Sequence, residues 1–341
     1  MFKENPLRHF HVDKNLVRFV GKDLQRPECI LAEPDGSLWS ADAHGGVVHL
    51  RPDGSQELIA QKRSADFSDS IDEADRFTKG TLPNGLAFAS NGDILISNFG
   101  TDCLEVMTRT GETRLLMDSI EGKPIGKVNF VLRDSRDRLW ITVTTRVKNW
   151  IDALVPDLDD GYIIRLDGRG AHIVADGLHF TNELRFDDHE EYLYVVETTG
   201  GRILRYRADA EGDLSGREVF GPSHLGKGAY PDGIAFDAFG NLWGTMVYSD
   251  KLFAITPEGE LLILLDEGDE SKVRRLDEAF FEKRVTPEIL FETGRGIAPW
   301  MASVTFGGPD LSTVYLGSLK ETSIPYFKSP VPGLPMVHWK R

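Results

Sequence analysis

The sequence predicts an all-β protein, a single six-bladed β-propeller with four-stranded blades that spans residues 1–341. Three observations predict this fold. A unit of two short apolar strands around a polar turn recurs along the chain, the length of this unit is nearly constant, and each copy is followed by a further pair of strands. A fixed repeat of about four strands is typical of a propeller blade.

Six copies of the unit are present, and five of them open with a side chain that carries oxygen. The opening residues are Glu28, Asn84, Asn129, Asn182, Asp232 and Ala302. In four copies a large apolar residue follows 11 positions after the opening residue: Trp39, Leu95, Trp140 and Trp243. The spacing is 12 to Tyr194 and 13 to Tyr315 in the fourth and sixth copies, so we expect the extra residues to lie in the turn.

The second pair of strands is clearest after the first and fifth copies. Residues 47–50 and 56–60 form one such pair, and residues 251–255 and 260–265 form another. Residues 15–20 near the N-terminus can supply a missing strand to the last blade. A seventh copy is not found, which favours six blades over seven.

The long insertions all fall in loops that share one end of the ring. Successive strands of a blade are antiparallel, so the loop before the first strand and the loop joining the second to the third lie at the same end. The insertions occupy residues 61–82, 145–160 and 266–300. Within the last, residues 270–283 have helical spacing, with Val273, Leu276 and Phe280 on one side. Long loops gathered on one face of a rigid scaffold commonly carry function.

The composition excludes some partners. The chain has 54 acidic and 39 basic residues and a formal charge of −15, which opposes binding to nucleic acid or anionic lipid. Residues 1–15 lack the apolar core of a secretory signal, and no apolar run is long enough to span a membrane. We therefore expect a cytoplasmic protein with no nucleic-acid or membrane partner.

The opening residues of the first strands predict a metal site at the centre of the ring. Carboxylate and amide oxygens suit Ca²⁺, Mg²⁺ or Mn²⁺, and a cation would relieve repulsion between the carboxylates. The alternative is that these are ordinary turn residues, as in Pro83-Asn84-Gly85 or Pro231-Asp232-Gly233. Glu28 and Asn182 occupy the equivalent place without that context, which favours the metal site.

Several ordered motifs carry a family resemblance. They are Pro-Asn-Gly-Leu-Ala-Phe from residue 83, Thr-Asn-Glu-Leu from 181, Pro-Asp-Gly-Ile-Ala-Phe-Asp from 231 and Phe-Gly-Gly-Pro-Asp-Leu from 306. Over residues 26–319 the chain resembles the family of gluconolactonase, senescence marker protein (regucalcin) and luciferin-regenerating enzyme. The resemblance implies a six-bladed propeller with one catalytic divalent metal held by Glu28, Asn182 and Asp232. It also implies that Asn129 lies beside the metal or the substrate, and that Lys127 matches a substrate-contacting arginine.

The chain departs from the family pattern in three places. The usual Glu-Gly-Pro of blade one is Glu28-Cys29-Ile30, the usual Asn-Asp of blade three is Asn129-Phe130, and the usual Asn-Gly of blade four is Asn182-Glu183. Phe130 indicates a less sugar-like pocket if it faces inward. The alternative is that Phe130 packs between blades.

We therefore expect a metal-dependent hydrolase of the lactonase type, acting on a small lactone or ester. The metal, Ca²⁺ first with Mg²⁺, Mn²⁺ and Zn²⁺ left open, would polarise the carbonyl while Asp232 activates water or attacks directly. Asn129 is a fourth candidate metal ligand. The candidate substrate-binding residues are Lys127, Asn129, Asn84, Phe130, Trp150 and Trp300.

Alternatives stay open for two residues and for the function. Lys127 is either a substrate contact or an exposed loop lysine, and Trp300 either forms a wall over the substrate or anchors its insertion to the ring. The bond cleaved is either that of a lactone or that of an aryl ester or phosphotriester, because the same metal would polarise a phosphoryl oxygen. The other alternative for the function is a non-catalytic binding propeller in which the metal is structural.

Overall fold

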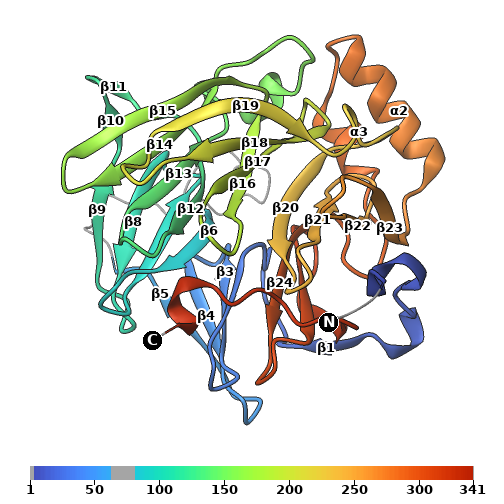
Figure 1. Ribbon diagram of the computed structural model, residues 1–341, viewed down its shortest axis with the longest axis horizontal. Helices are drawn as coiled ribbons and strands as arrows, with labels where there is room; N and C mark the ends of the chain where they lie inside the picture. Colours follow the sequence, from blue (N-terminus) through green and yellow to red (C-terminus); the bar gives the residue numbers. More distant parts are fainter. Residues whose placement is uncertain (1–3, 63–80, 341) are drawn as a thin grey trace.

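The computed structural model describes residues 4–62 and 81–340, which form six four-stranded antiparallel sheets around a common centre (Figure 1). The prediction of a six-bladed propeller with four-stranded blades is confirmed. Most of the insertion predicted at residues 61–82 lies outside the described residues.

Each of the first five blades uses four strands that follow one another in the chain. Blade one contains β2 (Ile30–Ala32), β3 (Leu38–Asp42), β4 (Gly46–Leu50) and β5 (Gln56–Ala60). Blade two contains β6 (Pro83–Phe88), β7 (Ile94–Asn98), β8 (Cys103–Met107) and β9 (Thr113–Met117). Blade three contains β12 (Val128–Arg133), β13 (Leu139–Val143), β14 (Gly161–Asp167) and β15 (Gly170–Leu178). Blade four contains β16 (Thr181–Phe186), β17 (Tyr192–Glu197), β18 (Arg202–Ala208) and β19 (Leu214–Phe220). Blade five contains β20 (Pro231–Phe236), β21 (Leu242–Met246), β22 (Lys251–Ile255) and β23 (Leu261–Asp266). A short hairpin, β10 (Ser119–Ile120) with β11 (Lys123–Pro124), stands outside the blades.

The sixth blade closes the ring by taking its outer strand from the other end of the chain. It contains β24 (Met301–Gly307), β25 (Thr313–Ser318) and β26 (Ile324–Lys328), and β26 pairs with β1 (Arg18–Val20). The pairing is antiparallel and brings Val20 opposite Ile324. The predicted N-terminal contribution to the last blade is confirmed.

The spacing within the repeated unit reflects how the first two strands of each blade pair with each other. In every blade the third residue after the opening residue pairs with the large residue at the end of the unit. These pairs are Leu31 with Trp39, Ala87 with Leu95, Leu132 with Trp140, Arg185 with Tyr194, Ala235 with Trp243 and Thr305 with Tyr315. The longer fourth and sixth copies keep this register, so the additional residues lie in the turns, as predicted.

An acidic residue at the end of the first strand fixes both the turn and the large residue of three blades. In blade five, Asp237 accepts hydrogen bonds from the backbone N–H groups of Phe239 and Asn241 and from Trp243 Nε1, each 2.9 Å long. Asp134 accepts from Trp140 Nε1 in blade three at 2.9 Å, and Glu33 accepts from Trp39 Nε1 in blade one at 2.6 Å. These indole N–H groups are buried and would otherwise lack a partner.

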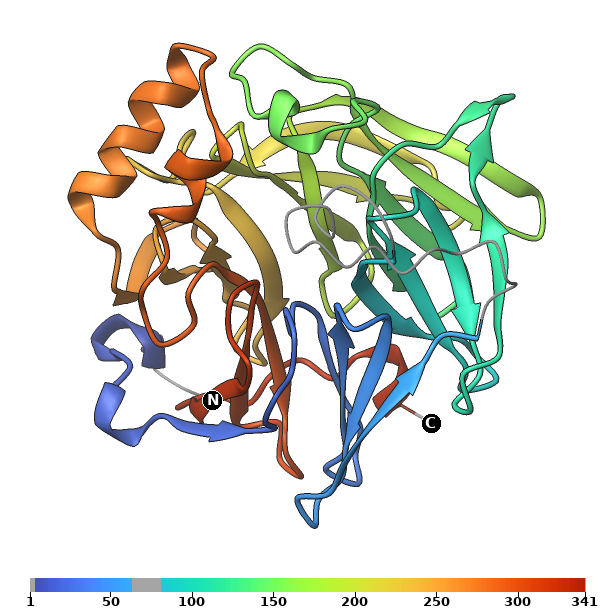
Figure 2. The same ribbon diagram turned by 180° about the vertical axis from the view of Figure 1, so that it is seen from behind.

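The insertion before blade six contains two helices at the rim of the ring, which Figure 2 shows in orange. They are α2 (Glu270–Phe281) and α3 (Pro287–Phe291). Asp269 caps α2, and its buried side is Val273, Leu276, Ala279 and Phe280, which confirms the predicted helix. The described residues also contain four short 3-10 turns: η1 (Pro6–His9), η2 (Lys14–Leu16), η3 (Trp150–Ala153) and η4 (Val337–Trp339). No helix in these parts of the chain is both long and apolar enough to cross a membrane.

The C-terminal segment crosses the end of the ring where the first strands finish (Figure 1). Leu334 N donates to Phe236 O of blade five at 2.8 Å, and Gly333 bridges Asp237. Further along, His338 and Trp339 bond the carbonyl of Ala32 in blade one at 2.8 and 2.9 Å. The segment therefore ties blade five to blade one across the centre.

We predict that Asp237→Ala destabilises the fold by about 2 to 4 kcal/mol, because Trp243 Nε1 and the Asn241 amide lose a buried acceptor. Urea unfolding followed by tryptophan fluorescence measures this change. Asp53→Ala is the matched control, since Asp53 also accepts a turn N–H but is fully exposed, and its stability should stay close to wild type. Equal stability of the two variants would contradict the role given to Asp237.

Candidate active site

A cavity that is partly open to solvent lies at the end of the ring where the first strands begin. Its polar lining comes from the opening residues of the first five blades and from one residue of the loop before blade one. These residues are Arg26, Glu28, Asn84, Asn129, Asn182 and Asp232. The structure thus brings together all four predicted metal ligands.

The apolar lining comes from the two sets of loops predicted to share this end. Leu82, Phe180 and Trp300 precede first strands, whereas Phe99, Trp150, Tyr248 and Leu319 lie in loops joining second strands to third strands. The shared face predicted from antiparallel pairing is therefore confirmed by the cavity that both sets of loops line.

Four buried oxygens in this cavity have no hydrogen-bond partner within the described residues. They are Glu28 Oε2, Asn129 Oδ1, Asn182 Oδ1 and Asp232 Oδ1, all on side chains that are at most 5% exposed. A buried oxygen without a partner is costly, and several of them in one cavity indicate a missing ligand. The four belong to the side chains predicted as metal ligands.

A chain of hydrogen bonds orients Glu28. Arg26 Nη2 donates to Asn84 Oδ1 at 2.9 Å, and Asn84 Nδ2 donates to Glu28 Oε1 at 2.9 Å and to the carbonyl of Asn129 at 3.1 Å. Asn84 is therefore engaged on both sides of its amide. It positions its neighbours and leaves Glu28 Oε2 directed to the cavity.

A second set of bonds orients Asn182. Its Nδ2 donates to Thr198 Oγ1 at 3.2 Å, and Thr198 in turn donates to the carbonyl of Pro231 at 2.7 Å. Pro231 directly precedes Asp232, so the hydroxyl links the two predicted ligands of blades four and five. With its nitrogen used in this way, Asn182 presents its oxygen to the cavity.

Burial dominates the electrostatics of the site. It raises the pKa of Glu28 and that of Asp232 well above the usual range, and the negative charges of Glu28 and Glu183 raise the pKa of Asp232 further. Burial lowers the pKa of Arg26, which the charges of Glu28 and Asp232 partly offset. Two buried carboxylates beside one guanidinium leave an excess of negative charge when both are ionised.

These residues fit a hard divalent cation. Two carboxylates and two amides supply four unpartnered oxygens, which is the ligand chemistry that Ca²⁺ and Mg²⁺ prefer. Over residues 4–62 and 81–340, no three His, Cys, Asp or Glu side chains form a group that could hold a metal ion. The four candidate ligands do not form a group of that kind, because two of them are asparagines.

Two predicted substrate residues do not line the cavity. Lys127 is buried with its Nζ 2.8 Å from Asp102 Oδ1, 3.3 Å from the carbonyl of Phe99 and 5.5 Å from the centre of that ring. It therefore supports the wall from behind and is not an exposed loop lysine. Phe130 packs in the core between blades with the Arg185 guanidinium 4.4 Å from its ring centre, so the packing alternative is the one observed.

Trp150 and Trp300 both line the cavity, as predicted, and Trp300 also anchors its insertion. The Trp300 backbone N–H donates to Asp250 Oδ1 at 2.8 Å and its Nε1 donates to Thr293 Oγ1 at 2.9 Å. The two roles left open for Trp300 are therefore compatible.

Sequence reasoning missed Arg26, Phe99, Phe180 and Tyr248. Arg26 precedes an opening residue by two positions, as Lys127 does, but it has a positive φ of 53°, a backbone state that the residue type does not signal. The three aromatic residues follow or precede strands by one or two positions. Their place relative to the strands was the signal that could have identified them.

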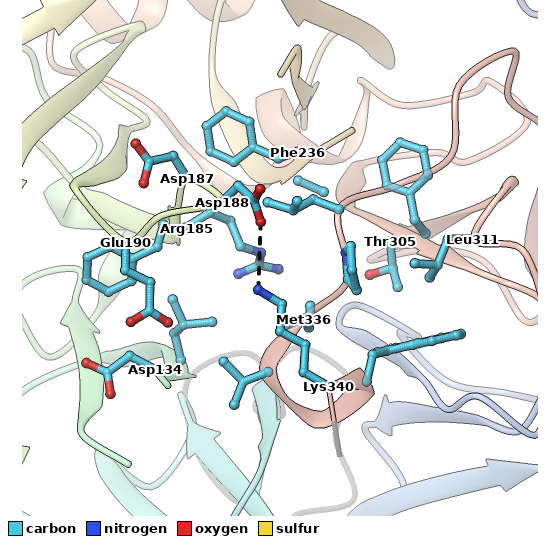
Figure 3. A pocket seen from close by; sticks show the side chains of 18 of the residues that line it. Asp134, Arg185, Asp187, Asp188, Glu190, Phe236, Thr305, Leu311, Met336 and Lys340 are labelled. Atoms are coloured by element: carbon cyan, nitrogen blue, oxygen red, sulfur yellow. Dashed lines mark ion pairs between the residues drawn. The ribbon is translucent and has the colours of Figure 1, made fainter. Parts of the chain in front are cut away.

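A second cavity lies at the opposite end of the ring, where the first strands finish (Figure 3). The C-terminal segment covers it, and Lys340 Nζ lies 3.7 Å from Asp188. Its acidic groups are used by the fold: Asp134 accepts from Arg138 and Trp140, and Glu190 accepts from Ser135. No buried unpartnered side-chain atom among the described residues lines this cavity, which distinguishes it from the cavity at the other end.

The fold and the first cavity together define a six-bladed propeller whose entrance holds a set of buried, unpartnered side-chain oxygens. A family model described as the SMP-30/gluconolactonase/LRE-like region matches residues 27–266, and the chain belongs to this family. The resemblance found in the sequence motifs is therefore confirmed.

Three curated relatives show the range of the family. The chain is 26% identical to 6-deoxy-6-sulfogluconolactonase of Pseudomonas putida over 48% of this chain and 47% of the relative. It is 30% identical to a pentonolactonase of Haloferax volcanii over 47% of this chain and 45% of the relative. It is 28% identical to the adipocyte plasma membrane-associated protein of Mus musculus over 71% of this chain and 59% of the relative. The matches thus span about half to three fifths of these relatives' own length.

Solved structures share the fold at low identity. A luciferin-regenerating enzyme superposes with a TM-score of 0.68 at 16% identity, covering 94% of this chain and 98% of that one. Regucalcin of Agrobacterium tumefaciens, described as a calcium-binding protein, gives 0.64 at 18% identity over 92% and 95%.

We predict that Lys127→Met changes stability and leaves KM for any substrate of this cavity unchanged. The variant removes the ion pair with Asp102 and the bond to Phe99 O, whereas the cavity lining stays in place. Thermal unfolding and steady-state kinetics measure the two effects separately. A tenfold or larger rise in KM at unchanged kcat would contradict this prediction and support the substrate contact predicted from the sequence.

Proposed function

We propose that the protein is a metal-dependent hydrolase that opens a lactone in the cavity at the entrance of the ring. The observation that supports this most directly is the set of four buried, unpartnered oxygens on Glu28, Asn129, Asn182 and Asp232. Two partial relatives named as lactonases support the same chemistry.

Glu28, Asn129, Asn182 and Asp232 would hold the cation, and Ca²⁺ is our first choice because all four donors are hard oxygens. The name of the similarly folded regucalcin supports this choice. When bound, the cation supplies Lewis-acid polarisation of the substrate carbonyl. Blades two and six would supply no ligand, because Asn84 is already engaged and blade six opens with Ala302.

Asp232 is the candidate general base. Its carboxylate is buried and lines the same cavity as the apolar wall; with Oδ1 on the cation, its second oxygen is the one that would take a proton from a water molecule in the cavity. Proton transfer from that water to Asp232 forms the nucleophile, and the proton can then pass to the alcohol oxygen that leaves when the ring opens. Direct attack by Asp232 on the carbonyl is the other route.

Arg26 is the candidate group for binding negative charge. It is the cationic side chain of the cavity lining, and its bond to Asn84 fixes its guanidinium beside the Glu28 side of the site. As the carbonyl carbon becomes tetrahedral, negative charge grows on its oxygen, and a fixed guanidinium stabilises it.

We predict that Asp232→Asn and Glu28→Gln each lower the affinity for added Ca²⁺ at least tenfold, because each removes one negative ligand. The measurement is the rise in melting temperature on adding Ca²⁺ to chelator-treated protein, since a ligand of the native state stabilises it. Asp187→Asn, at the other end of the ring, is the matched control and should respond as wild type does. A wild-type protein whose melting temperature is unaffected by Ca²⁺, Mg²⁺, Mn²⁺ and Zn²⁺ would contradict the metal site.

We further predict that Asp232→Asn lowers kcat for lactone hydrolysis by about 10² to 10⁴ at saturating metal, as expected for loss of a general base. The assay is metal-stripped enzyme tested on a lactone panel with each cation added back. Hydrolysis of phosphotriesters or aryl esters without lactone turnover would favour the alternative substrates. No hydrolysis at all, with lower stability in Asp232→Asn, would favour the binding propeller.

A further inference from the structure

The proposed active-site cavity is divided into a polar end and an apolar wall. The polar side chains all lie at or just before the starts of the first strands, around the proposed cation. The remaining lining consists of two leucines and five aromatic side chains, namely Leu82, Leu319, Phe99, Trp150, Phe180, Tyr248 and Trp300. A ligand that fills this cavity therefore meets hydrogen-bonding groups at one end and rings around the rest.

The aromatic wall is rigid because its rings pack edge to face. Trp150 contacts Phe99 and Phe180 with ring centres 6.4 Å apart in both pairs and interplanar angles of 71° and 65°. On the opposite side, Tyr248 meets Trp300 at 5.5 Å and 82°. Such contacts hold the rings in place before a ligand arrives.

The wall offers few hydrogen bonds to a ligand. Trp300 Nε1 is already bonded to Thr293, and the other rings of the wall present carbon except for the Trp150 N–H and the Tyr248 hydroxyl. A sugar lactone carries a hydroxyl on nearly every ring carbon, and each hydroxyl placed against this wall would lose a bond to water without a replacement. An apolar ring placed there would instead gain by leaving water.

From this division we infer that the substrate is a lactone fused to, or carrying, a flat apolar ring, and not a polyhydroxylated sugar lactone. The inference rests on the proposed lactonase function and adds the substrate class. Trp150 and Phe180 are the residues that we assign to this selectivity, because they pack edge to face against each other in the cavity wall and come from loops of two different blades.

The test compares two six-membered lactones that both release an alcohol when the ring opens: 3-isochromanone, which has a fused benzene ring, and glucono-1,5-lactone, which has hydroxyls. Hydrolysis is followed by pH-stat titration with the Ca²⁺-loaded full chain, after subtraction of the spontaneous rate. We expect kcat/KM to be at least a hundredfold higher for 3-isochromanone. Trp150→Ala and Phe180→Leu should each lower that value tenfold or more and so narrow the ratio between the two substrates.

Phe281→Ala is the matched control, since Phe281 is a 66% exposed aromatic residue at the end of α2 and lies outside the cavity lining. Its kinetics should equal those of wild type, and melting temperatures confirm that each variant is folded. A sugar lactone hydrolysed as fast as 3-isochromanone would overturn the substrate inference and leave the lactonase proposal standing. Absence of hydrolysis of both compounds would overturn the lactonase proposal and the inference together.

Discussion

The antiparallel pairing of β1 with β26 is the contact on which the rest of the structure depends, because it joins the two ends of the chain and closes the ring. Only a closed ring brings Glu28 of blade one beside Asp232 of blade five, which are 204 positions apart in the sequence. The C-terminal segment adds a second connection by bonding Phe236 and Ala32 across the other end. The site residues are thus held by strands that are themselves fixed at both ends of the ring.

Much of the fold could be predicted because strand register leaves a trace in the sequence. The distance of 11 residues between an opening residue and its large partner reflects the pairing of Ala235 with Trp243 and its equivalents, and a turn of fixed length lies between. A glycine such as Gly240, whose φ is 95°, marks the turn between these two strands in the sequence. Helix α2 was likewise visible from its apolar spacing.

The site was only partly predictable, because its members are set by two different constraints. The proposed ligand residues sit at a repeated position, so one rule placed Glu28, Asn129, Asn182 and Asp232 at the same end of the ring. The wall residues come from loops of unequal length, so no fixed spacing from an opening residue identifies them, and only its position just outside a strand separates Phe180 in the cavity from Phe130 in the core. Lys127 shows the same limit, since its partner Asp102 lies in a neighbouring blade and becomes visible only in three dimensions.

Charge balance connects the oxygen ligands to Arg26. With Glu28 and Asp232 ionised, the cavity holds two negative charges and the single positive charge of Arg26, and burial makes this excess unfavourable. A bound divalent cation would reverse the sign, so that the cavity would carry net positive charge in largely buried surroundings. Negative charge developing on a substrate oxygen would then be stabilised by groups already in place, and the apolar wall would strengthen the effect by lowering the local dielectric constant. The burial that makes the two carboxylates unfavourable on their own would therefore favour the proposed reaction once a cation is bound.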